Sequence, residues 1–419
     1  MRQGIEEAVT ELLGSNVPHF DPRDGDLAEA VFRVADGLLH EFPDGEFAPG
    51  SGGTHTVEIN RSIPLFTQLS IKLARSKAAV RLIQKPVRVS VVFAMYKEHT
   101  RMLRPDEHPH GEDFLLRKIA QLHWLFDDTP VEWRLIAVDD GCPEGSGLLA
   151  QKILKERAPD EPITVLFLKD ALAEELEVVS PMTMVSESQK GGSIIFGMWH
   201  AAVRHPKNHL VVFTDADLSV DLGQTGLLVD GILRNNKNAA IASRRQPESA
   251  VVKTGHRNTR GKLFIYLWKG LLGPLRYITD TQCGFKAFRA EQLLENIETI
   301  AEKGFAFDLE LLLVTELGRS QSIEKVPIAW IDSEAASTTT DLEPYLSMLR
   351  SAVAMYRKYL PQDPKSNSIA QLIEDMTESD WTYLSEHIPG KIAEADPRKF
   401  GEPMLTTIEE LVSIAKRSG

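Results

Sequence analysis

The sequence predicts an α/β protein in which a largely parallel sheet is flanked by helices, with helical additions at both ends. Between residues 86 and 335, short apolar runs alternate with stretches of helical length whose apolar residues recur every three or four positions. Polar motifs follow most of these apolar runs. Because a parallel sheet binds ligands beyond the carboxyl ends of its strands, we expect the functional site along that edge.

The strand and helix candidates come in regular order. Apolar runs of strand length occupy residues 87–94, 133–138, 163–168, 210–214, 239–243 and 325–330. Helical spacing occupies residues 114–126, 148–157 and 192–203 between them. An alternation of this kind is typical of βαβ units, whose consecutive strands run parallel.

The regions outside this alternation are expected to be helical. We divide the chain into a helical accessory segment, a main domain, and a linker with a helical tail, at residues 1–85, 86–360 and 361–419. Helical spacing occurs at residues 5–13, 27–42 and 344–360, whereas residues 43–53 form a Pro- and Gly-rich loop and residues 361–367 a linker. The acidic tail from residue 368 predicts a packing or interaction surface.

One basic stretch of the accessory segment has two interpretations. Residues 59–97 contain no acidic residue, and apolar residues between positions 66 and 83 fall on one arc of a helix. Such a helix either lies on anionic lipid or packs against the protein with its basic residues at a solvated rim. The packed helix is the commoner case and is the one we expect.

Composition excludes several classes of protein. The 419 residues carry a formal charge of −13, which argues against nucleic acid as the main partner. The two cysteines make no disulfide framework, and the first residues lack the apolar core of a signal peptide. No apolar run approaches the length of about 18 residues that spans a membrane. We expect a soluble, cytoplasmic protein, with peripheral contact to the inner face of a membrane as the alternative.

Asp215-Ala216-Asp217 is the most informative motif of the chain, because it directly follows the apolar run at residues 210–214. Two carboxylates one residue apart at the end of a buried strand converge on one hard cation. Mg²⁺ and Mn²⁺ prefer such oxygen ligands and use their other positions for phosphate oxygens. Most isolated Asp-x-Asp sequences are only loop carboxylates or helix caps, so the surrounding motifs decide.

Four further motifs accompany this pair, each at the end of a strand or the start of a helix. They are Tyr96-Lys97-Glu98, Asp139-Asp140-Gly141-Cys142, Lys190-Gly191-Gly192 and Asp280-Thr281-Gln282-Cys283-Gly284-Phe285-Lys286. In this order the set resembles the family-2 inverting glycosyltransferases of the Rossmann-like GT-A fold. The polyprenyl-phosphate hexosyltransferase branch is the most similar, especially the dolichyl-phosphate glucosyltransferase type. The resemblance covers about residues 86–360.

The resemblance implies that a hexose moves from a nucleotide sugar, with a UDP-sugar favoured, and that Mg²⁺ or Mn²⁺ is the cofactor. Asp217 would be the principal metal ligand and Asp215 a second one, with Ser219 as a weaker addition. The chain departs from the family in two places: Lys97 replaces an asparagine and Cys142, a spectator, replaces a serine. The residues expected at the nucleotide sugar are Tyr96, Glu98, Asp139, Asp140, Lys190, Asp215 and Ala216.

The resemblance also implies an acceptor side. Asp280 is the candidate catalytic base or orienting group, unless it only caps a helix or closes a turn, and Asp217 is the other catalytic candidate. Asp308 and Glu310 either order the acceptor loop or cap a helix. The residues expected at a phosphate or at the acceptor are Arg244, His256, Arg257, Arg260 and Gln282, although a solvated basic loop would also explain the three at positions 256–260.

Two acceptor classes remain open. The motif at residues 280–286 and the arginines favour a polyprenyl phosphate, whereas the unfamiliar N-terminal segment and the acidic total favour a soluble small molecule, toward which we lean. A phosphate acceptor is already ionised, whereas a sugar hydroxyl needs a general base. Two other classes compete with a glycosyltransferase: a sugar-phosphate nucleotidyltransferase and a non-catalytic protein that binds sugar nucleotides.

Overall fold

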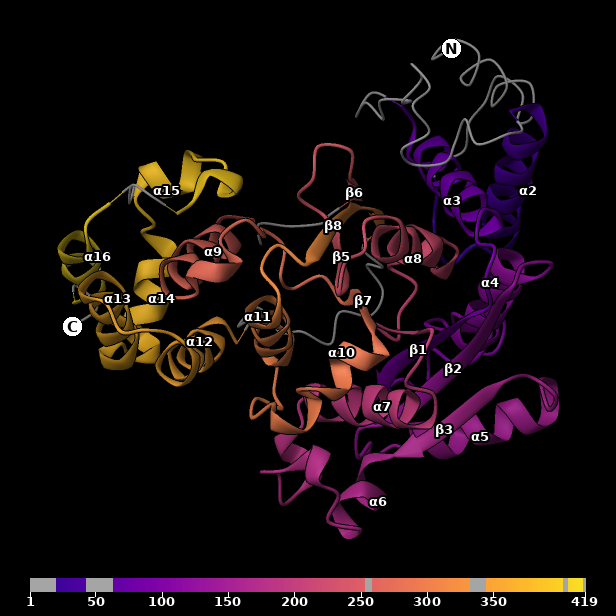
Figure 1. The fold of residues 1–419 in the computed structure, drawn as a ribbon, viewed down its shortest axis with the longest axis horizontal. Coiled ribbons are helices and arrows are strands. Elements are labelled where there is room, and N and C mark those ends of the chain that lie inside the picture. The colour runs from indigo at the N-terminus through magenta and orange to yellow at the C-terminus, as the bar shows by residue number, and fades with distance from the viewer. Residues whose placement is uncertain (1–19, 43–62, 253–257, 332–343, 402–405, 417–419) are drawn as a thin grey trace.

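A seven-stranded sheet forms the centre of the computed structural model, which describes residues 20–42, 63–252, 258–331, 344–401 and 406–416 (Figure 1). The strand order is β3-β2-β1-β4-β7-β5-β8. The strands are β1 (Val87–Met95), β2 (Val131–Asp139), β3 (Ile163–Phe167), β4 (His209–Thr214), β5 (Ala239–Ser243), β7 (Phe285–Arg289) and β8 (Ile323–Pro327). A separate two-stranded sheet joins β6 (Ala250–Val252) to β9 (Ala329–Ile331).

The expected α/β fold is confirmed, and one strand was not predicted. All six expected strand regions contain strands, but the region at 325–330 is divided between β8 and β9. β7 lies between β4 and β5 and runs antiparallel to both, whereas the other strands of the large sheet are parallel. Phe285, the first residue of β7, pairs with Thr214, the last residue of β4. The chain therefore enters β7 at the edge where the parallel strands end.

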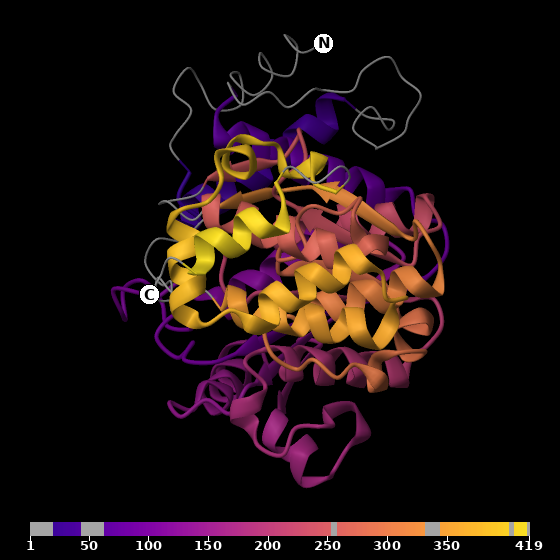
Figure 2. The same ribbon diagram turned by 90° about the vertical axis from the view of Figure 1, so that its left-hand side faces the viewer.

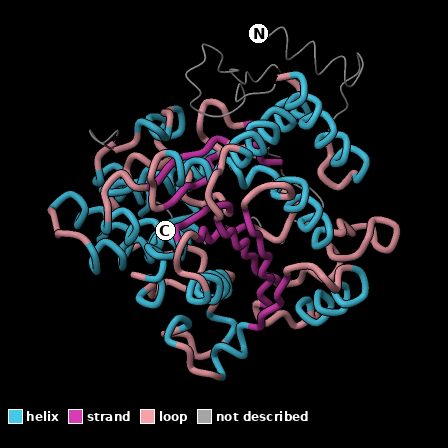
Figure 3. The backbone as a smooth tube through the Cα atoms, turned by 45° about the vertical axis from the view of Figure 1, so that its right-hand side comes forward, coloured by secondary structure: helices cyan, strands magenta, loops and turns pink. Residues whose placement is uncertain are grey.

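Helices cover both faces of the sheet, as Figure 3 shows. Val91 and Phe93 of β1 face one hydrophobic cluster and Val92 faces the other, in the alternation that a strand buried on both sides requires. The first cluster contains residues of α4 (Phe114–Phe126), α5 (Ser146–Arg157) and α8 (Thr225–Arg234). The second contains residues of α6 (Leu168–Ala173), α7 (Gly191–Arg204), α9 (Asn258–Leu271), α10 (Ala290–Leu294), α11 (Phe307–Gly318) and α12 (Tyr345–Tyr359).

Two helices of the N-terminal addition, α2 (Gly25–Glu41) and α3 (Leu65–Arg81), dock on the main domain. They share a small core with β9 and partly buried residues of α4. Asp36 of α2 accepts hydrogen bonds from Trp124 Nε1 of α4 at 2.9 Å and from Lys77 Nζ of α3 at 2.8 Å. One carboxylate thus joins the two helices to α4.

The basic helix α3 is packed, as expected, but its cations do not form a solvated rim. Lys72 is 1% exposed and its Nζ donates to the carbonyl of Pro327 at 3.0 Å. Arg75 pairs with Glu248 at 3.4 Å and Lys77 with Asp36 at 2.8 Å. These three side chains point into contacts with the protein, whereas Arg81 in the last turn of α3 is exposed. Contact of α3 with a lipid surface stays a prediction. A sequence shows the number of cations on a helix but not their direction.

The C-terminal helices gather around α9, at the opposite end of the molecule from α2 and α3 (Figure 1, Figure 2). They are α13 (Pro364–Asp375), α14 (Glu378–Glu386), α15 (Gly390–Glu394) and α16 (Ile408–Ala415). A Cβ on Gly270 of α9 would overlap Ile369 of α13, so the two helices are in direct contact. The linker is shorter than predicted, because α13 begins at Pro364 with Asp363 as its cap. Within the described residues, no helix has both the length and the apolar content needed to span a membrane.

The buried Lys72 leads to a prediction about stability. Burial lowers the pKa of Lys72 from 10.5 to about 7. Between these two pH values the unfolded chain binds a proton that the folded protein does not, so stability rises with pH by at most about 1.4 kcal/mol per unit. We expect urea unfolding at pH 7, 8 and 9 to show a smaller increase for Lys72→Met than for the wild type. Lys85→Met, at an exposed position, is the control. Equal pH slopes in all three proteins would contradict the burial of Lys72.

Candidate active site

The motifs at the carboxyl ends of β1, β2 and β4 lie together, as the fold requires. The backbone N–H of Asp140, after β2, donates to the carbonyl of Met95 at the end of β1, at 3.0 Å. The N–H of Lys190, before α7, donates to Asp140 Oδ2 at 2.8 Å, and Lys190 Nζ pairs with Asp215 after β4. Three strand ends and one helix start thus form a continuous polar edge.

The two aspartates after β2 have different tasks. Among the described residues, the donors to the Asp139 carboxylate are backbone N–H groups, those of Gly141 and Cys142 at 3.1 Å and that of Gly147 at 2.7 Å. It therefore shapes the loop that leads into α5. Asp140 reaches across to α7, where its Oδ1 accepts from Ser193 Oγ at 2.6 Å. Burial raises the pKa of Asp140, although the hydrogen bonds from α7 oppose that shift.

Lys190 and Asp215 form the ion pair at the middle of this edge. Burial alone would raise the pKa of Asp215, but the Lys190 ammonium outweighs it and holds the pKa below its usual value. A Cβ on Gly284 would overlap the Asp215 carboxylate, so the segment before β7 passes directly against this side chain. The close approach explains why glycine is needed at this position of the 280–286 motif.

Asp217 is held on one side and open on the other. Its Oδ1 accepts from the N–H of Ser219 at 3.0 Å, and its backbone carbonyl accepts from Lys118 Nζ at 2.9 Å. The second carboxylate oxygen, Oδ2, lies 3.9 Å from Arg101 Nη2. Ser219 therefore acts through its backbone, whereas we expected its hydroxyl to be a weak metal ligand. Ser219 is also buried, since only 4% of its surface is exposed.

The aspartate pair suits a hard divalent cation. The side chains of Asp215 and Asp217 are 32% and 29% exposed, so both carboxylates reach solvent at the strand end. Within the described residues, no group of three or more His, Cys, Asp or Glu side chains is placed to hold a metal. A cation bound here would therefore take its remaining ligands from water or from a substrate phosphate, as Mg²⁺ commonly does.

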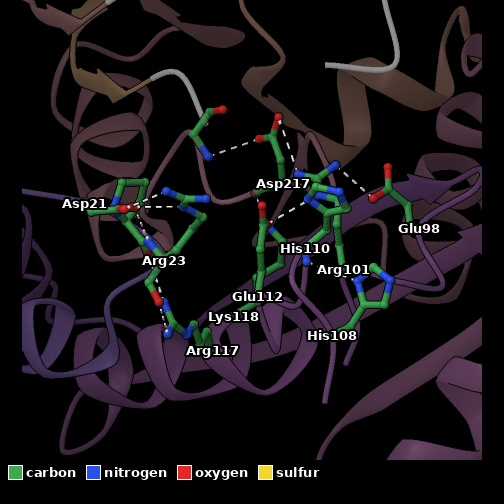
Figure 4. Close-up of polar contacts among 12 residues, drawn as sticks. Asp21, Arg23, Glu98, Arg101, His108, His110, Glu112, Arg117, Lys118 and Asp217 are labelled. Carbon is green, nitrogen blue, oxygen red and sulfur yellow. Dashed lines mark hydrogen bonds and ion pairs between the residues drawn. The ribbon is translucent and has the colours of Figure 1, made fainter. Parts of the chain in front are cut away.

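The sequence did not indicate three charged residues that surround Asp217, namely Arg101, Glu112 and Lys118 (Figure 4). Arg101 pairs with Glu98 at 2.9 Å, so Glu98 is engaged with a cation rather than free to contact a ribose. Burial raises the pKa of Glu98 to about 7 and lowers the pKa of Lys118 to about 8. One signal was present: Lys118 stands among the buried apolar positions of α4, where a lysine needs a partner. Tyr96, in contrast, is 49% exposed and open to a ligand.

Asp280 is fully engaged by Arg244 on the acceptor side. Its Oδ2 accepts from the N–H of Arg244 at 2.7 Å and from Nε at 2.9 Å, and its Oδ1 accepts from Nη2 at 2.7 Å. Burial would raise the pKa of Asp280, but the guanidinium holds it well below its usual range. A carboxylate in this state is a poor proton acceptor, and Asp280 lies in a loop before β7 rather than at a helix cap. The geometry favours the orienting role over the basic one.

Asp308 orders the segment after Asp280, one of the two roles expected for it. Its Oδ1 accepts from Gln282 Nε2 at 2.9 Å and its Oδ2 from Lys286 Nζ at 2.8 Å. Lys286 also donates to the carbonyl of Cys283 at 2.6 Å. Glu310 instead joins α11 to α12: it accepts hydrogen bonds from the N–H of Glu302 at 2.7 Å and from the hydroxyl of Tyr359 of α12 at 2.6 Å.

The basic loop expected near the acceptor is only partly described. His256 and Arg257 lie outside the described residues. Arg260 lies in α9, and its guanidinium is 3.9 Å from Glu386 of α14. Arg260 thus contacts the C-terminal addition, whereas Arg244 lies at the sheet edge with its guanidinium 5.4 Å from the ring centre of Trp330.

The sheet and its polar edge resemble the glycosyltransferases with the GT-A fold, the class of enzyme that the sequence predicts. No family model matches the chain. It is 23% identical over 283 residues to dolichyl-phosphate β-glucosyltransferase of Saccharomyces cerevisiae, covering 65% of this chain and 75% of that protein. The human dolichyl-phosphate β-glucosyltransferase is 24% identical over 269 residues, covering 62% and 72%. These relatives confirm the predicted enzyme class and the predicted resemblance to this type of glycosyltransferase.

A solved structure also resembles the chain. It is glucosyl-3-phosphoglycerate synthase from Mycobacterium tuberculosis, in complex with Mn²⁺, UDP and glucosyl-3-phosphoglycerate. The sequences are 18% identical, the match covers 70% of this chain and 85% of that chain, and the TM-score is 0.44.

The contacts of Asp140 lead to a prediction about nucleotide binding. The two carboxylate oxygens of Asp140 accept hydrogen bonds from the Lys190 N–H and from Ser193 Oγ. In Asp140→Asn, an amide nitrogen takes the place of one of these oxygens and cannot accept a hydrogen bond, so one of the two contacts is lost. We expect the start of α7 to lose its position and the affinity for UDP, measured by calorimetry, to fall by about tenfold, which is 1.4 kcal/mol. Ser193→Ala removes one of the two contacts and should have a smaller effect. An unchanged UDP affinity in a folded Asp140→Asn protein would limit Asp140 to a structural role.

Proposed function

We propose that this enzyme transfers a hexose from a nucleotide sugar, with UDP as the favoured nucleotide, to the phosphate of a polyprenyl-phosphate acceptor, with inversion at the anomeric carbon. The pairing of Asp280 with Nε and Nη2 of the Arg244 guanidinium carries this proposal. Asp308 is paired with Lys286 and Asp215 with Lys190. Each carboxylate near the 280–286 segment therefore has a cation, and a base for a hydroxyl acceptor is missing among the described residues there. An ionised phosphate needs none.

This proposal reverses our lean toward a soluble acceptor. The relatives that the chain matches are named for transfer to dolichyl phosphate, which supports the lipid-carrier class. In the proposed step, a phosphate oxygen forms a bond to the anomeric carbon while the bond from that carbon to the nucleotide diphosphate breaks. No proton moves, and the negative charge passes from the acceptor to the departing diphosphate.

The residues at the strand ends would bind different parts of the nucleotide sugar and its metal ion. Tyr96 is exposed beside the loop that Asp139 shapes, which favours contact with the nucleotide base. Asp215 and Asp217 would hold Mg²⁺ or Mn²⁺, which when bound neutralises charge on the departing diphosphate. Lys190, paired with Asp215 at the start of α7, brings an ammonium to the same place. Its position favours a role beside the donor phosphates.

Arg244 is the proposed acceptor-phosphate ligand, and Asp280 is the residue that positions it. Asp280 occupies Nε and Nη2, whereas Nη1 has no hydrogen-bond partner among the described residues. A guanidinium fixed on one edge by a carboxylate presents its other edge in a defined direction, which suits recognition of a phosphate. The Arg244 side chain is 18% exposed, so it is not closed off from solvent.

The metal assignment is tested by Asp217→Asn. Loss of one anionic ligand removes stabilisation of the leaving diphosphate, and such electrostatic contributions are commonly worth several kcal/mol. We expect turnover to fall by about 10²-fold or more while the melting temperature stays close to that of the wild type. Full wild-type activity in EDTA, or more than about a tenth of it in the variant, would overturn the assignment.

The acceptor assignment is tested by an acceptor panel and by Asp280→Asn. With a UDP-hexose donor, we expect glycosylation of a polyprenyl phosphate and none of phosphoglyceric acid or of a neutral sugar. If Asp280 only orients Arg244, the variant should raise the acceptor KM by about tenfold and keep the shape of the pH–rate profile. A general base would instead show a fall in kcat of about 10²-fold and loss of the acidic limb of that profile. That result, or product from a soluble acceptor alone, would contradict the proposal.

A further inference from the structure

Arg101 directs each nitrogen of its guanidinium at a different carboxylate (Figure 4). Nη1 lies 2.9 Å from Glu98 Oε2, Nε lies 3.3 Å from Glu112 Oε2, and Nη2 lies 3.9 Å from Asp217 Oδ2. The Arg101 side chain is 8% exposed and that of Glu112 is 1% exposed. One buried cation thus connects the expected metal ligand to two carboxylates from the segment between β1 and α4.

The backbone of this segment fixes the guanidinium in place. The N–H of Arg101 donates to the carbonyl of Glu98 at 3.1 Å, and the carbonyl of Arg101 accepts from the N–H of Glu112 at 3.0 Å. A Cβ on Gly111 would overlap the carbonyl of Arg104, so the two ends of the loop are packed closely. The ion pairs and the backbone hydrogen bonds therefore join the same residues, and Arg101 has little freedom to turn away.

The distance from Arg101 to Asp217 is longer than its distances to Glu98 and Glu112, which leaves Asp217 without a direct hydrogen bond from the guanidinium. Oδ1 of Asp217 accepts from the Ser219 N–H, whereas Oδ2, the oxygen that Arg101 faces, has both lone pairs open to a metal. At 3.9 Å the guanidinium compensates the charge of this oxygen without making a hydrogen bond to it. If the cation were removed, Glu98, Glu112 and Asp217 would lose their shared counterion, and the greater negative charge around Asp217 Oδ2 would attract a divalent ion more strongly.

We propose that Arg101 is a positioning residue that makes metal binding depend on the nucleotide. It balances the charge of Glu98 and Glu112, and it leaves Asp217 Oδ2 with too little negative charge to hold a divalent cation tightly. The diphosphate of the donor then supplies the missing charge and ligands. This inference rests on the proposed function, because it assumes that the cation is shared between Asp217 and a nucleotide diphosphate.

The test measures Mn²⁺ binding through the paramagnetic resonance signal of the free ion, with and without UDP. In the wild type, we expect weak binding that tightens at least tenfold when UDP is present. In Arg101→Gln, binding without UDP should tighten at least tenfold, the gain from UDP should shrink, and kcat should fall at least tenfold. Arg104→Gln removes an exposed arginine from the same loop and should behave as the wild type.

The opposite signs of these effects separate positioning from a structural role. A merely structural loss at Arg101 would weaken Mn²⁺ binding and activity together, and that result would overturn the inference. If Arg101→Gln does not fold, Arg101→Lys decides: its ammonium reaches fewer carboxylates, so Mn²⁺ binding without UDP should tighten about threefold, and unchanged binding would overturn the inference. A wild-type protein that binds no Mn²⁺ even with UDP would instead overturn the metal assignment of the proposed function.

Discussion

Several carboxylates lie close together at one edge of the sheet, and a buried carboxylate costs several kcal/mol unless a cation pairs with it. The protein meets this constraint pair by pair: Lys190 with Asp215, Arg244 with Asp280, Lys286 with Asp308, and Arg101 with Glu98. Lys190, Arg244 and Lys286 each come from a segment other than that of the aspartate they pair with, whereas Arg101 follows Glu98 within the same loop. The ion pairs therefore hold the strand ends and helix starts together as well as balancing their charge.

The sequence predicted the sheet and the positions of the aspartates well, because both depend on local patterns. Apolar runs identified the parallel strands, and the residue that follows a buried strand must lie at its carboxyl end. The sequence did not predict β7, because its first residues belong to the 280–286 motif. In the structure, Phe285 and Ala287 lie in one hydrophobic cluster and Phe288 in the other, as expected for a strand. Lys286 lies fully buried inside this strand, which a sequence pattern does not suggest.

The pairing of charges was the part that the sequence did not determine. Whether Asp280 is a base or an orienting group depends on where Arg244 points, and 35 residues separate the two along the chain. The direction of Lys72 in α3 and the engagement of Glu98 by Arg101 are further cases. In each case the sequence pointed to the residue, but its contacts depend on a partner that the fold brings near. Composition fixes the number of charges, but the tertiary structure selects the pairs.

The reversed direction of β7 has a consequence for how this enzyme class diversifies. The parallel strands bring the motifs of β1, β2 and β4 to the edge at their last residues, but β7 brings residues 280–285 to the same edge at its first residues. The chain then leaves the site and continues into α10 at the far end of the sheet. An insertion or exchange just before β7 would lengthen one loop without shifting the register of β1, β2 or β4. Under the proposed function, the segment that meets the acceptor can therefore change in length without moving the strand ends that meet the donor.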